Sequence, residues 1–339
     1  MIKPTLQQIA EVLAISPATV SKALSGKPEV NEYTRNRVLA CAQELGYTAG
    51  PGGSAQRIRR TAILIEDPEP NESCNTFYYD ILIGFKRYGA AKGLETLILP
   101  LTATPTQGKK SYDDYLRAKH IDGVFISGLK KGDAYIAALE TTQIPTVVLD
   151  FSCANPRVGR IGVDNVLGAR IGVEHLIELG HRKIGFLNGH GAAPVSDERL
   201  AGYTAALCRR GIGFRPELVF EGDYREESGI AGADYFIGAG VTGLFCASDL
   251  MAVGAMRRFQ ERGFEVPGDI SIVGFDNMPF GAFCTPRLTT VAQDRIGLGV
   301  AACALLQGLM SDSPLKHCVL PPALTLREST KQARVGPLG

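Results

Sequence analysis

The sequence predicts an N-terminal all-α helix-turn-helix head followed by an α/β core of two doubly wound, parallel-sheet lobes. Three observations lead to this fold class. Three short helical patterns fill the first 46 residues, a glycine- and proline-rich stretch follows, and strands then alternate with helices over roughly 270 residues. One doubly wound lobe rarely holds so many βα units, so two lobes with a cleft between them are expected.

The composition is that of a folded protein. The chain has 339 residues, of which 45% are hydrophobic and 21% are charged, so it can bury large cores and wholesale disorder is excluded. It contains no run of about 18 apolar residues and no apolar N-terminal signal segment, which predicts a cytoplasmic protein without a membrane span. The eight cysteines are scattered with no CxxC pair, so we expect reduced core residues and no metal site.

Charge is distributed unevenly along the chain. Residues 1–60 carry eight lysines and arginines against four glutamates, a net charge of +4, whereas the remainder carries −3. A basic head on a slightly acidic body suggests an anionic partner for the head alone, such as nucleic acid.

Start and stop signals define the three head helices. The first covers residues 5–13 with Thr5 as its N-cap. The second begins after Ser16 with Pro17 in its first turn and ends at Ala23 or Leu24, and the third follows Asn31. The apolar residues expected to face inward are Leu6, Ile9, Ala10, Leu13, Val20, Leu24, Val38, Ala42 and Leu45.

The tight turn between the first two helices is typical of a helix-turn-helix. The outer side of the second helix carries only small or polar groups: Pro17, Ala18, Ser21, Lys22 and Ser25. A helix that reads a DNA groove needs short side chains for close approach, hydroxyls for phosphates and a cation for a guanine edge. The alternative is an ordinary helical bundle with a solvated face.

Residues 48–60, TAGPGGSAQRIRR, form the predicted linker. Gly50-Pro51-Gly52-Gly53 cannot hold a helix, whereas SAQRIRR can form one turn or two. The segment is either a flexible basic tether or one that folds on DNA.

Predicted strands and helices alternate along the core. Strands are predicted at 61–68, 95–101, 123–128, 145–150, 160–164, 183–189, 218–223, 243–249 and 271–276. The clearest helices are at 77–92, 111–119 and 168–180, with other helices between the later strands.

The sequence shows no convincing enzyme motif. Residues 238–243 match GxGxxG, but they precede a strand instead of following one, so a helix-to-strand turn is the better interpretation. His175 and His181 lie six residues apart and are expected to have capping or core roles. The sequence contains no GxSxG elbow and shows no nucleophile–base pair, so nothing argues for catalysis.

Polar residues recur where predicted strands end. Asp150, Ser248, Asp249 and Asp276 occupy such positions, and Arg199 lies just beyond another strand–loop junction. In parallel sheets these ends gather at one edge, where ligands bind. Carboxylates with an arginine suit a polyol's hydroxyls, and aromatic faces suit its C–H side. The aromatic candidates are Phe77, Tyr78 and Tyr224.

With these motifs in place, the chain resembles the LacI/GalR (lactose-repressor) family of bacterial transcriptional regulators from about residue 4 to 328. The head resembles the family's DNA-binding segment, and IGVDNVLGARIGVEHLIELGHRKIGFLNG resembles its central signature. SDERLAGY, FCASDLMAVGAM, ISIVGFDN and PRLTTVAQD follow in the family's order. The resemblance implies a helix-turn-helix domain (1–48), a hinge (49–60), an effector-binding and dimerisation core similar to periplasmic binding proteins (61–330), and a tail (331–339). Lobe one would be about 61–160 plus 292–322, and lobe two about 161–290.

The resemblance also implies particular DNA contacts. They fall on Thr5, Leu6, Ser16, Pro17, Ala18, Thr19, Ser21, Lys22, Ser25, Asn31 and Ile58. Pro17 and Ala18 would make apolar contacts such as one with a thymine methyl, and Ile58 would wedge open a minor-groove step. Lys22 stands where the family often has arginine, so a guanine contact would lack the bidentate fork. The GPGG stretch departs from the family's hinge pattern, so either the hinge does not order as in the family or its ordering depends more strongly on DNA. Ordering such a segment costs about 1–2 kcal/mol per residue, and the head is expected to be mobile without operator.

In the core, the resemblance implies effector contacts from Phe77, Tyr78, Asp150, Arg199, Tyr224, Ser248, Asp249 and Asp276. The expected partners are a pseudo-palindromic double-stranded operator, a small-molecule effector and a second copy of the chain, with no cofactor. The tail lacks leucine heptads, so a tetramer-forming extension is not expected. Effector binding would change the angle between the lobes and so the operator affinity. A sugar or sugar derivative is the expected effector; the alternative is a nucleobase or other metabolite acting as co-repressor.

Overall fold

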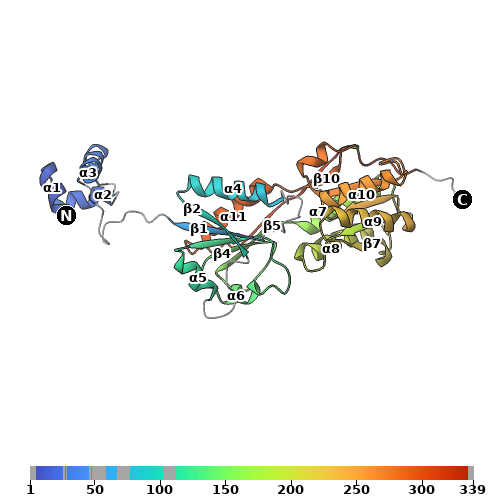
Figure 1. Cartoon of the computed structure of the whole chain (residues 1–339), viewed down its shortest axis with the longest axis horizontal. Helices are drawn as coiled ribbons and strands as arrows, with labels where there is room; N and C mark the ends of the chain where they lie inside the picture. Colours follow the sequence, from blue (N-terminus) through green and yellow to red (C-terminus); the bar gives the residue numbers. More distant parts are fainter. Residues whose placement is uncertain are drawn as a thin grey trace. The chain divides into compact units, whose positions relative to one another are not determined.

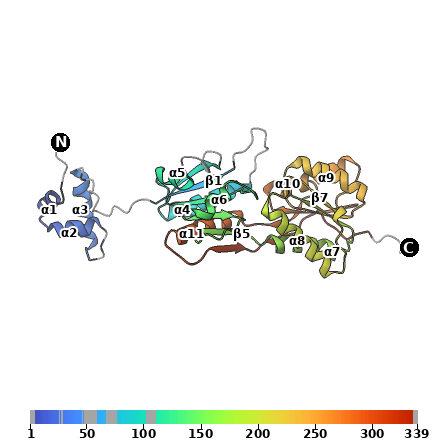
Figure 2. The same ribbon diagram turned by 90° about the horizontal axis from the view of Figure 1, so that it is seen from below.

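The computed structural model describes residues 5–25, 27, 29–45, 47, 59–66, 77–101 and 111–334. It divides into two compact units, residues 1–59 and 60–339. The first contains the three head helices and the second contains two α/β lobes (Figures 1 and 2). Among the described residues, no helix has both the length and the apolar character needed to cross a membrane.

The head consists of α1 (Leu6–Leu13), α2 (Pro17–Leu24) and α3 (Glu32–Glu44). Each helix begins at a local cap, and the caps of the first two, Thr5 and Ser16, were predicted. Thr5 and Gln8 form a capping box, the Ser16 Oγ accepts from the Thr19 amide at 3.0 Å, and the Asn31 Oδ1 accepts from the Thr34 amide at 2.8 Å. The head's core contains Ile9, Ala10, Val20, Ala23, Val30, Val38, Cys41 and Ala42.

One inward-facing prediction in the head was wrong. Leu45 follows the last turn of α3 and is 40% exposed, whereas Cys41 takes the buried place beside Ala42. The helical period places residue 45 over residues 41 and 42 only while the helix continues, and α3 ends at Glu44.

Lobe one is built on a six-stranded parallel sheet with strand order β11-β5-β4-β3-β1-β2. Its strands are β1 (Arg60–Ile65), β2 (Glu95–Pro100), β3 (Gly123–Ile126), β4 (Thr146–Leu149), β5 (Val158–Val163) and β11 (His317–Leu320). Helices α4 (Phe77–Ala91) and α11 (Arg295–Leu309) cover one face, and α5 (Tyr112–Ala118) and α6 (Tyr135–Thr141) cover the other (Figure 1). Successive strand residues supply opposite faces: Ile63 and Phe125 join the α4–α11 core, while Leu64 and Val124 join the α5–α6 core.

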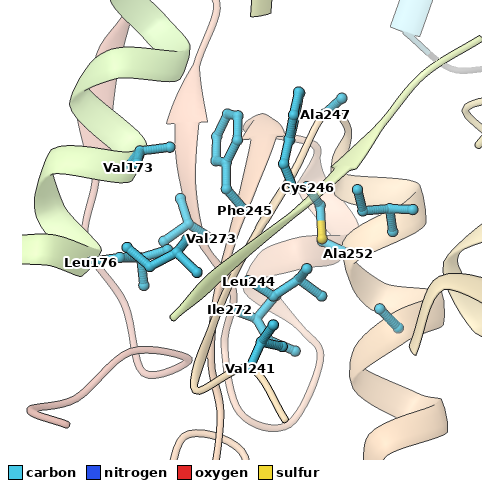
Figure 3. Close-up of a cluster of buried hydrophobic side chains, with 14 of the residues drawn as sticks. Val173, Leu176, Val241, Leu244, Phe245, Cys246, Ala247, Ala252, Ile272 and Val273 are labelled. Carbon is cyan, nitrogen blue, oxygen red and sulfur yellow. The ribbon is translucent and has the colours of Figure 1, made fainter. Parts of the chain in front are cut away.

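Lobe two has a second six-stranded sheet of order β12-β10-β9-β8-β6-β7, parallel except for β12. Its strands are β6 (Ile184–Asn188), β7 (Val219–Glu221), β8 (Gly243–Cys246), β9 (Ser271–Asp276), β10 (Thr289–Ala292) and β12 (Ala323–Thr325). Its helices are α7 (Asn165–Glu178), α8 (Pro194–Arg209), α9 (Glu226–Ala239) and α10 (Asp249–Glu261), with 3₁₀ turns at Pro216–Leu218 and Pro279–Ala282. Figure 3 shows the core: Val173 and Leu176 of α7 lie toward Phe245, and Ala252 of α10 lies toward Cys246.

The chain passes between the lobes three times, from β5 to α7, from β10 to α11 and from β11 to β12. The expected boundary between the lobes, at about residues 160 and 161, would divide β5. All of β5, up to Val163, belongs to the sheet of lobe one, so the chain crosses to lobe two after this strand. The sequence pattern missed β10, β11, β12 and α6, which are only three to seven residues long. It also missed the 15-residue α11, whose sequence RIGLGVAACALLQGL is apolar almost throughout and so shows little helical periodicity. The turn at residues 238–243 is the predicted helix-to-strand connection, with Gly240 in the left-handed region at φ 64°.

Candidate functional site

The outer face of α2 carries the small and polar surface that the sequence predicted. Val20 and Ala23 point into the head, and Pro17, Ala18, Ser21 and Lys22 are exposed. This alternation follows from the 3.6-residue period, which separates 17, 18, 21 and 22 from 20 and 23. A surface with such short side chains can approach the floor of a major groove.

The remaining head residues divide between capping and contact roles. The Ser16 Oγ and Thr19 Oγ1 lie 2.8 Å apart, and the Ser25 hydroxyl donates to the Ser21 carbonyl at 2.6 Å. Lys22 pairs with Glu29 at 3.1 Å, with both side chains more than half exposed. Exposed ion pairs contribute little to stability, so Lys22 can leave Glu29 and bind a group on DNA instead. Thr5 and Asn31 cap their helices, Leu6 is half-buried, and Ile58 lies outside the described residues.

In the second unit, Arg199 is the centre of the candidate site. It projects from α8, is 4% exposed and makes three directed contacts. Its Nε donates to the Asn165 Oδ1 at 2.9 Å, its Nη1 donates to the Ala247 carbonyl, and its Nη2 lies 4.0 Å from the Asp276 Oδ1. Its guanidinium carbon lies 3.9 Å from the centroid of the Phe275 ring, so the cation stacks on an aromatic face.

Asp276 and Asp150 approach Arg199 from different lobes. Asp276 ends β9 in lobe two and accepts from the Gln293 Nε2 at 2.7 Å, while Asp150 follows β4 in lobe one. Burial raises the pKa of Asp276 to about 6 and that of Asp150 to about 7, against the opposing effect of Arg199 on both. The Asp150 Oδ1 is buried and has no hydrogen-bond partner among the described residues. Both carboxyl groups are poised to accept hydrogen bonds that a neutral ligand could donate.

Aromatic side chains from both lobes complete this group. Phe77 and Tyr78 begin α4 and pack edge to face at 5.3 Å. The pKa of Tyr78 is raised by burial and by the charges of neighbours that include Asp150 of lobe one and Asp276 of lobe two. Tyr224 of lobe two bonds the Ser196 Oγ at 2.8 Å and meets the His190 ring edge to face at 5.5 Å. We use "inter-lobe site" for Tyr78, Asp150, Arg199, Tyr224 and Asp276.

Three of the predicted contacts lie outside this group: Phe77, which packs against Tyr78, and Asp249 and Ser248. Asp249 is fully buried, and its oxygens accept from the Thr290 hydroxyl at 2.5 Å and from the Met278 amide at 2.6 Å. It therefore fixes the loop after β9. The Ser248 Oγ accepts from the Met251 amide at 3.2 Å as the N-cap of α10. Both residues follow a strand in the sequence, but their polar atoms have partners within lobe two.

Sequence reasoning missed several residues around Arg199. Asn165 accepts a hydrogen bond from Arg199, and Gln293 donates one to Asp276. Arg295 donates to the Asp276 carbonyl and forms an ion pair with Asp80 of α4 at 2.7 Å. Asn165 and Gln293 each stand one or two residues after a strand end, next to a crossover. This position is the signal that could have identified them.

Each of the two units matches a known protein family. The family model "Bacterial regulatory proteins, lacI family" matches residues 5–49, and the model of a periplasmic binding protein-like domain matches residues 173–330. The chain is 34% identical over 338 residues to the HTH-type transcriptional repressor CytR of Escherichia coli (strain K12), covering 96% of each chain.

Two solved structures resemble nearly the whole chain. A lac repressor dimer bound to operator and the anti-inducer ONPF has a TM-score of 0.75 and 28% identity, with coverage of 97% of this chain and 100% of that chain. The complex of the transcriptional regulator CelR with cellobiose has a TM-score of 0.71 and 28% identity, with coverage of 96% and 100%. The chain therefore belongs to the LacI family of bacterial transcriptional regulators: DNA-binding repressors, not enzymes, in which a helix-turn-helix is joined to a periplasmic-binding-protein-like effector domain.

Proposed function

We propose that this protein represses transcription as a homodimer on a pseudo-palindromic operator, and that an uncharged, hydroxyl-rich effector bound at the inter-lobe site sets its operator affinity. The observation that carries the proposal is the pair of buried carboxyl groups, Asp150 and Asp276, beside the guanidinium of Arg199. Two acceptors from different lobes can hold one ligand and so stabilise one angle between the lobes.

The charge balance favours a neutral ligand over an acidic one. The Arg199 guanidinium already donates to Asn165 and to the Ala247 carbonyl, so one nitrogen, Nη2, remains directed toward Asp276. A phosphate or carboxylate group would need several donors and would meet two carboxyl groups instead. A sugar or sugar derivative can donate its hydroxyls to both aspartates and lay its C–H face on Tyr78. A nucleobase with ring and exocyclic N–H donors is the second candidate, because Tyr78 and Tyr224 also offer aromatic faces.

The homodimer is supported by apolar side chains left exposed on the second unit. Tyr79 of α4 is 63% exposed, Ile98 on the edge strand β2 is 43% exposed, and Ile296 of α11 is 45% exposed. Helices α4 and α11 pack directly on each other, with the Ile296 carbonyl against Gly84. Exposed apolar groups on packed neighbouring helices are typical of an association surface.

In the head, we assign groove reading to α2, with Pro17 and Ala18 as apolar contacts and Lys22 as the cation. Ser16, Thr19, Ser21 and Ser25 would contact phosphates, joined by Thr5, Leu6 and Asn31 near the helix ends. Ile58 remains the proposed minor-groove wedge. The Ser16 hydroxyl accepts from the Thr19 amide and can still donate its proton to a phosphate oxygen. The Ser25 hydroxyl would first have to release the Ser21 carbonyl, to which it donates its proton.

The test begins with selection of binding sites from randomised duplexes by the full chain, because the sequences enriched in this selection define the operator. Operator affinity is then measured with ribose, cellobiose, gluconate, ribose 5-phosphate, adenosine and adenine in turn. We expect a palindromic site whose affinity changes with a neutral compound, and loss of that change in Arg199→Ala with operator binding kept. Absence of any preferred site would refute the repressor assignment, and a response only to the acidic compounds would refute the neutral effector.

A further inference from the structure

A chain of hydrogen bonds leads from Arg199 back to lobe one. Its first link is Asn165, the first residue of α7, which is 2% exposed and accepts from the Arg199 Nε at 2.9 Å. Its position just after the crossover from β5 places it where the two lobes join.

The orientation of the Asn165 amide is fixed by its other side. The Nδ2 donates to the Glu198 Oε2 at 2.9 Å and to the Val163 carbonyl at 3.2 Å. Two acceptors at the nitrogen leave only the oxygen to face Arg199, so the amide cannot flip without losing all three bonds. Glu198 and the Val163 carbonyl together therefore keep the Asn165 oxygen directed at the Arg199 Nε, and Glu198 makes the shorter of the two bonds.

Glu198 is held in turn from the other lobe. Its Oε1 pairs with the Nη2 of Arg160 at 2.5 Å, and both side chains are about three-quarters buried. Arg160 belongs to β5 in the sheet of lobe one, whereas Glu198 belongs to α8 in lobe two. A largely buried ion pair with good geometry is sensitive to small displacements, because each partner is costly to leave alone.

We infer that Arg160, Glu198 and Asn165 form a positioning relay that makes the orientation of Arg199 depend on where lobe one lies. A rotation between the lobes stretches the Arg160–Glu198 contact, frees Glu198 to turn, and loosens the amide that holds the Arg199 Nε. The link between this relay and effector control rests on the proposed role of Arg199 in binding. The relay itself acts on a bond that can be observed without any effector.

The test follows the Arg199 Nε–H in the effector-free full chain. Arginine is labelled with ¹⁵N, and the signal is assigned by its disappearance in Arg199→Lys. We expect hydrogen exchange of this proton to be slow in the parent and about tenfold faster in Glu198→Gln, which keeps the side chain's size but removes the charge that holds Arg160. Arg160→Gln should accelerate the exchange to a similar degree from the other lobe.

A matched control lies on the same two helices. Glu178 of α7 pairs with Arg210, at the end of α8, at 2.8 Å on the surface, so Glu178→Gln makes the same chemical change in an exposed ion pair without touching the relay. It should leave the exchange rate unchanged, and thermal melting identifies any variant that has lost its fold. An unchanged Arg199 signal in folded Glu198→Gln, or an equal acceleration in Glu178→Gln, would overturn the relay. Acceleration in Glu198→Gln but not in Arg160→Gln would overturn its dependence on lobe one.

Discussion

The ring of Phe275 stacks on the guanidinium of Arg199 and, through its Cε2 and Cζ edge, leaves no room for a side chain at Gly168 of α7. A Cβ built at Gly168 would lie 2.7 Å from the Phe275 Cε2 and 2.8 Å from its Cζ. The close approach of α7 to the sheet therefore fixes the ring, and the ring supports the cation of the inter-lobe site.

Gly168→Ala should thus destabilise the protein, by about 1–3 kcal/mol, because the ring must move to admit the methyl group. Thermal or urea unfolding measures the change. Gly238→Ala in α9 is the matched control, since nothing lies within 4 Å of its Cβ position. It should stabilise the helix by up to about 1 kcal/mol. Equal effects of the two substitutions would contradict the contact.

Asp150→Asn should stabilise the effector-free protein, and the gain should grow with pH. The pKa of Asp150 is raised to about 7 from the 3.8 of a free carboxyl group, so the folded state is stable with the acid protonated and loses stability as the pH rises through this range. The gain from asparagine should increase between about pH 4 and pH 7 and then level off, reaching on the order of 1–3 kcal/mol. Unfolding curves at pH 5, 6, 7 and 8 test this, and a gain that is constant with pH would show that Asp150 is not buried as described.

Lys22→Ala should lower affinity for the selected operator by about tenfold to a hundredfold, the worth of one base contact. Lys22→Arg should retain or raise the affinity, because the guanidinium can bind guanine with two bonds. Titration of labelled duplex gives both values. Lys92→Ala, on the second unit beside Tyr88, should change nothing. A normal, sequence-specific affinity in Lys22→Ala would count against the base contact.

His181 should make stability fall at acidic pH. It is buried, with its Nδ1 3.0 Å from the Thr242 hydroxyl and its Nε2 3.1 Å from the Lys331 carbonyl. The carbonyl requires a donor at Nε2, so the neutral ring accepts at Nδ1. Burial lowers its pKa below 6.5, and so the unfolded chain binds a proton that the folded chain does not. Stability should be full above about pH 7 and decline below about pH 6.5.

His181→Gln should flatten this decline, because glutamine can still donate to the carbonyl without titrating. The exposed His317→Gln on β11 is its control. Melting temperatures between about pH 5 and pH 8 compare the three proteins. His175 is also partly buried with a lowered pKa, so some acid sensitivity should remain after His181→Gln. A decline identical to the parent's would show that His181 does not cause the loss of stability at acidic pH.

The sequence by itself determined the three head helices, the outward face of α2 and most core strands. These features depend on neighbours within a few positions: Ser16 bonds the Thr19 amide, Pro17 starts the helix, and periodicity separates buried from exposed residues. Strand-end positions also marked Asp150, Asp276 and Arg199 as candidates, and the family resemblance implied that they contact an effector.

Only the tertiary structure decided which polar strand-end residues can meet a ligand. Asp249 and Asp276 both stand at the carboxyl end of a strand, yet Asp249 is satisfied by Thr290, 41 positions away, while Asp276 faces Arg199. Asn165 likewise looked like any residue after a strand until the crossover placed it against Arg199. The reason is physical: a buried polar group's role depends on which partners satisfy it, and those partners are supplied by chain crossovers and sheet order, which leave no periodic trace in the sequence.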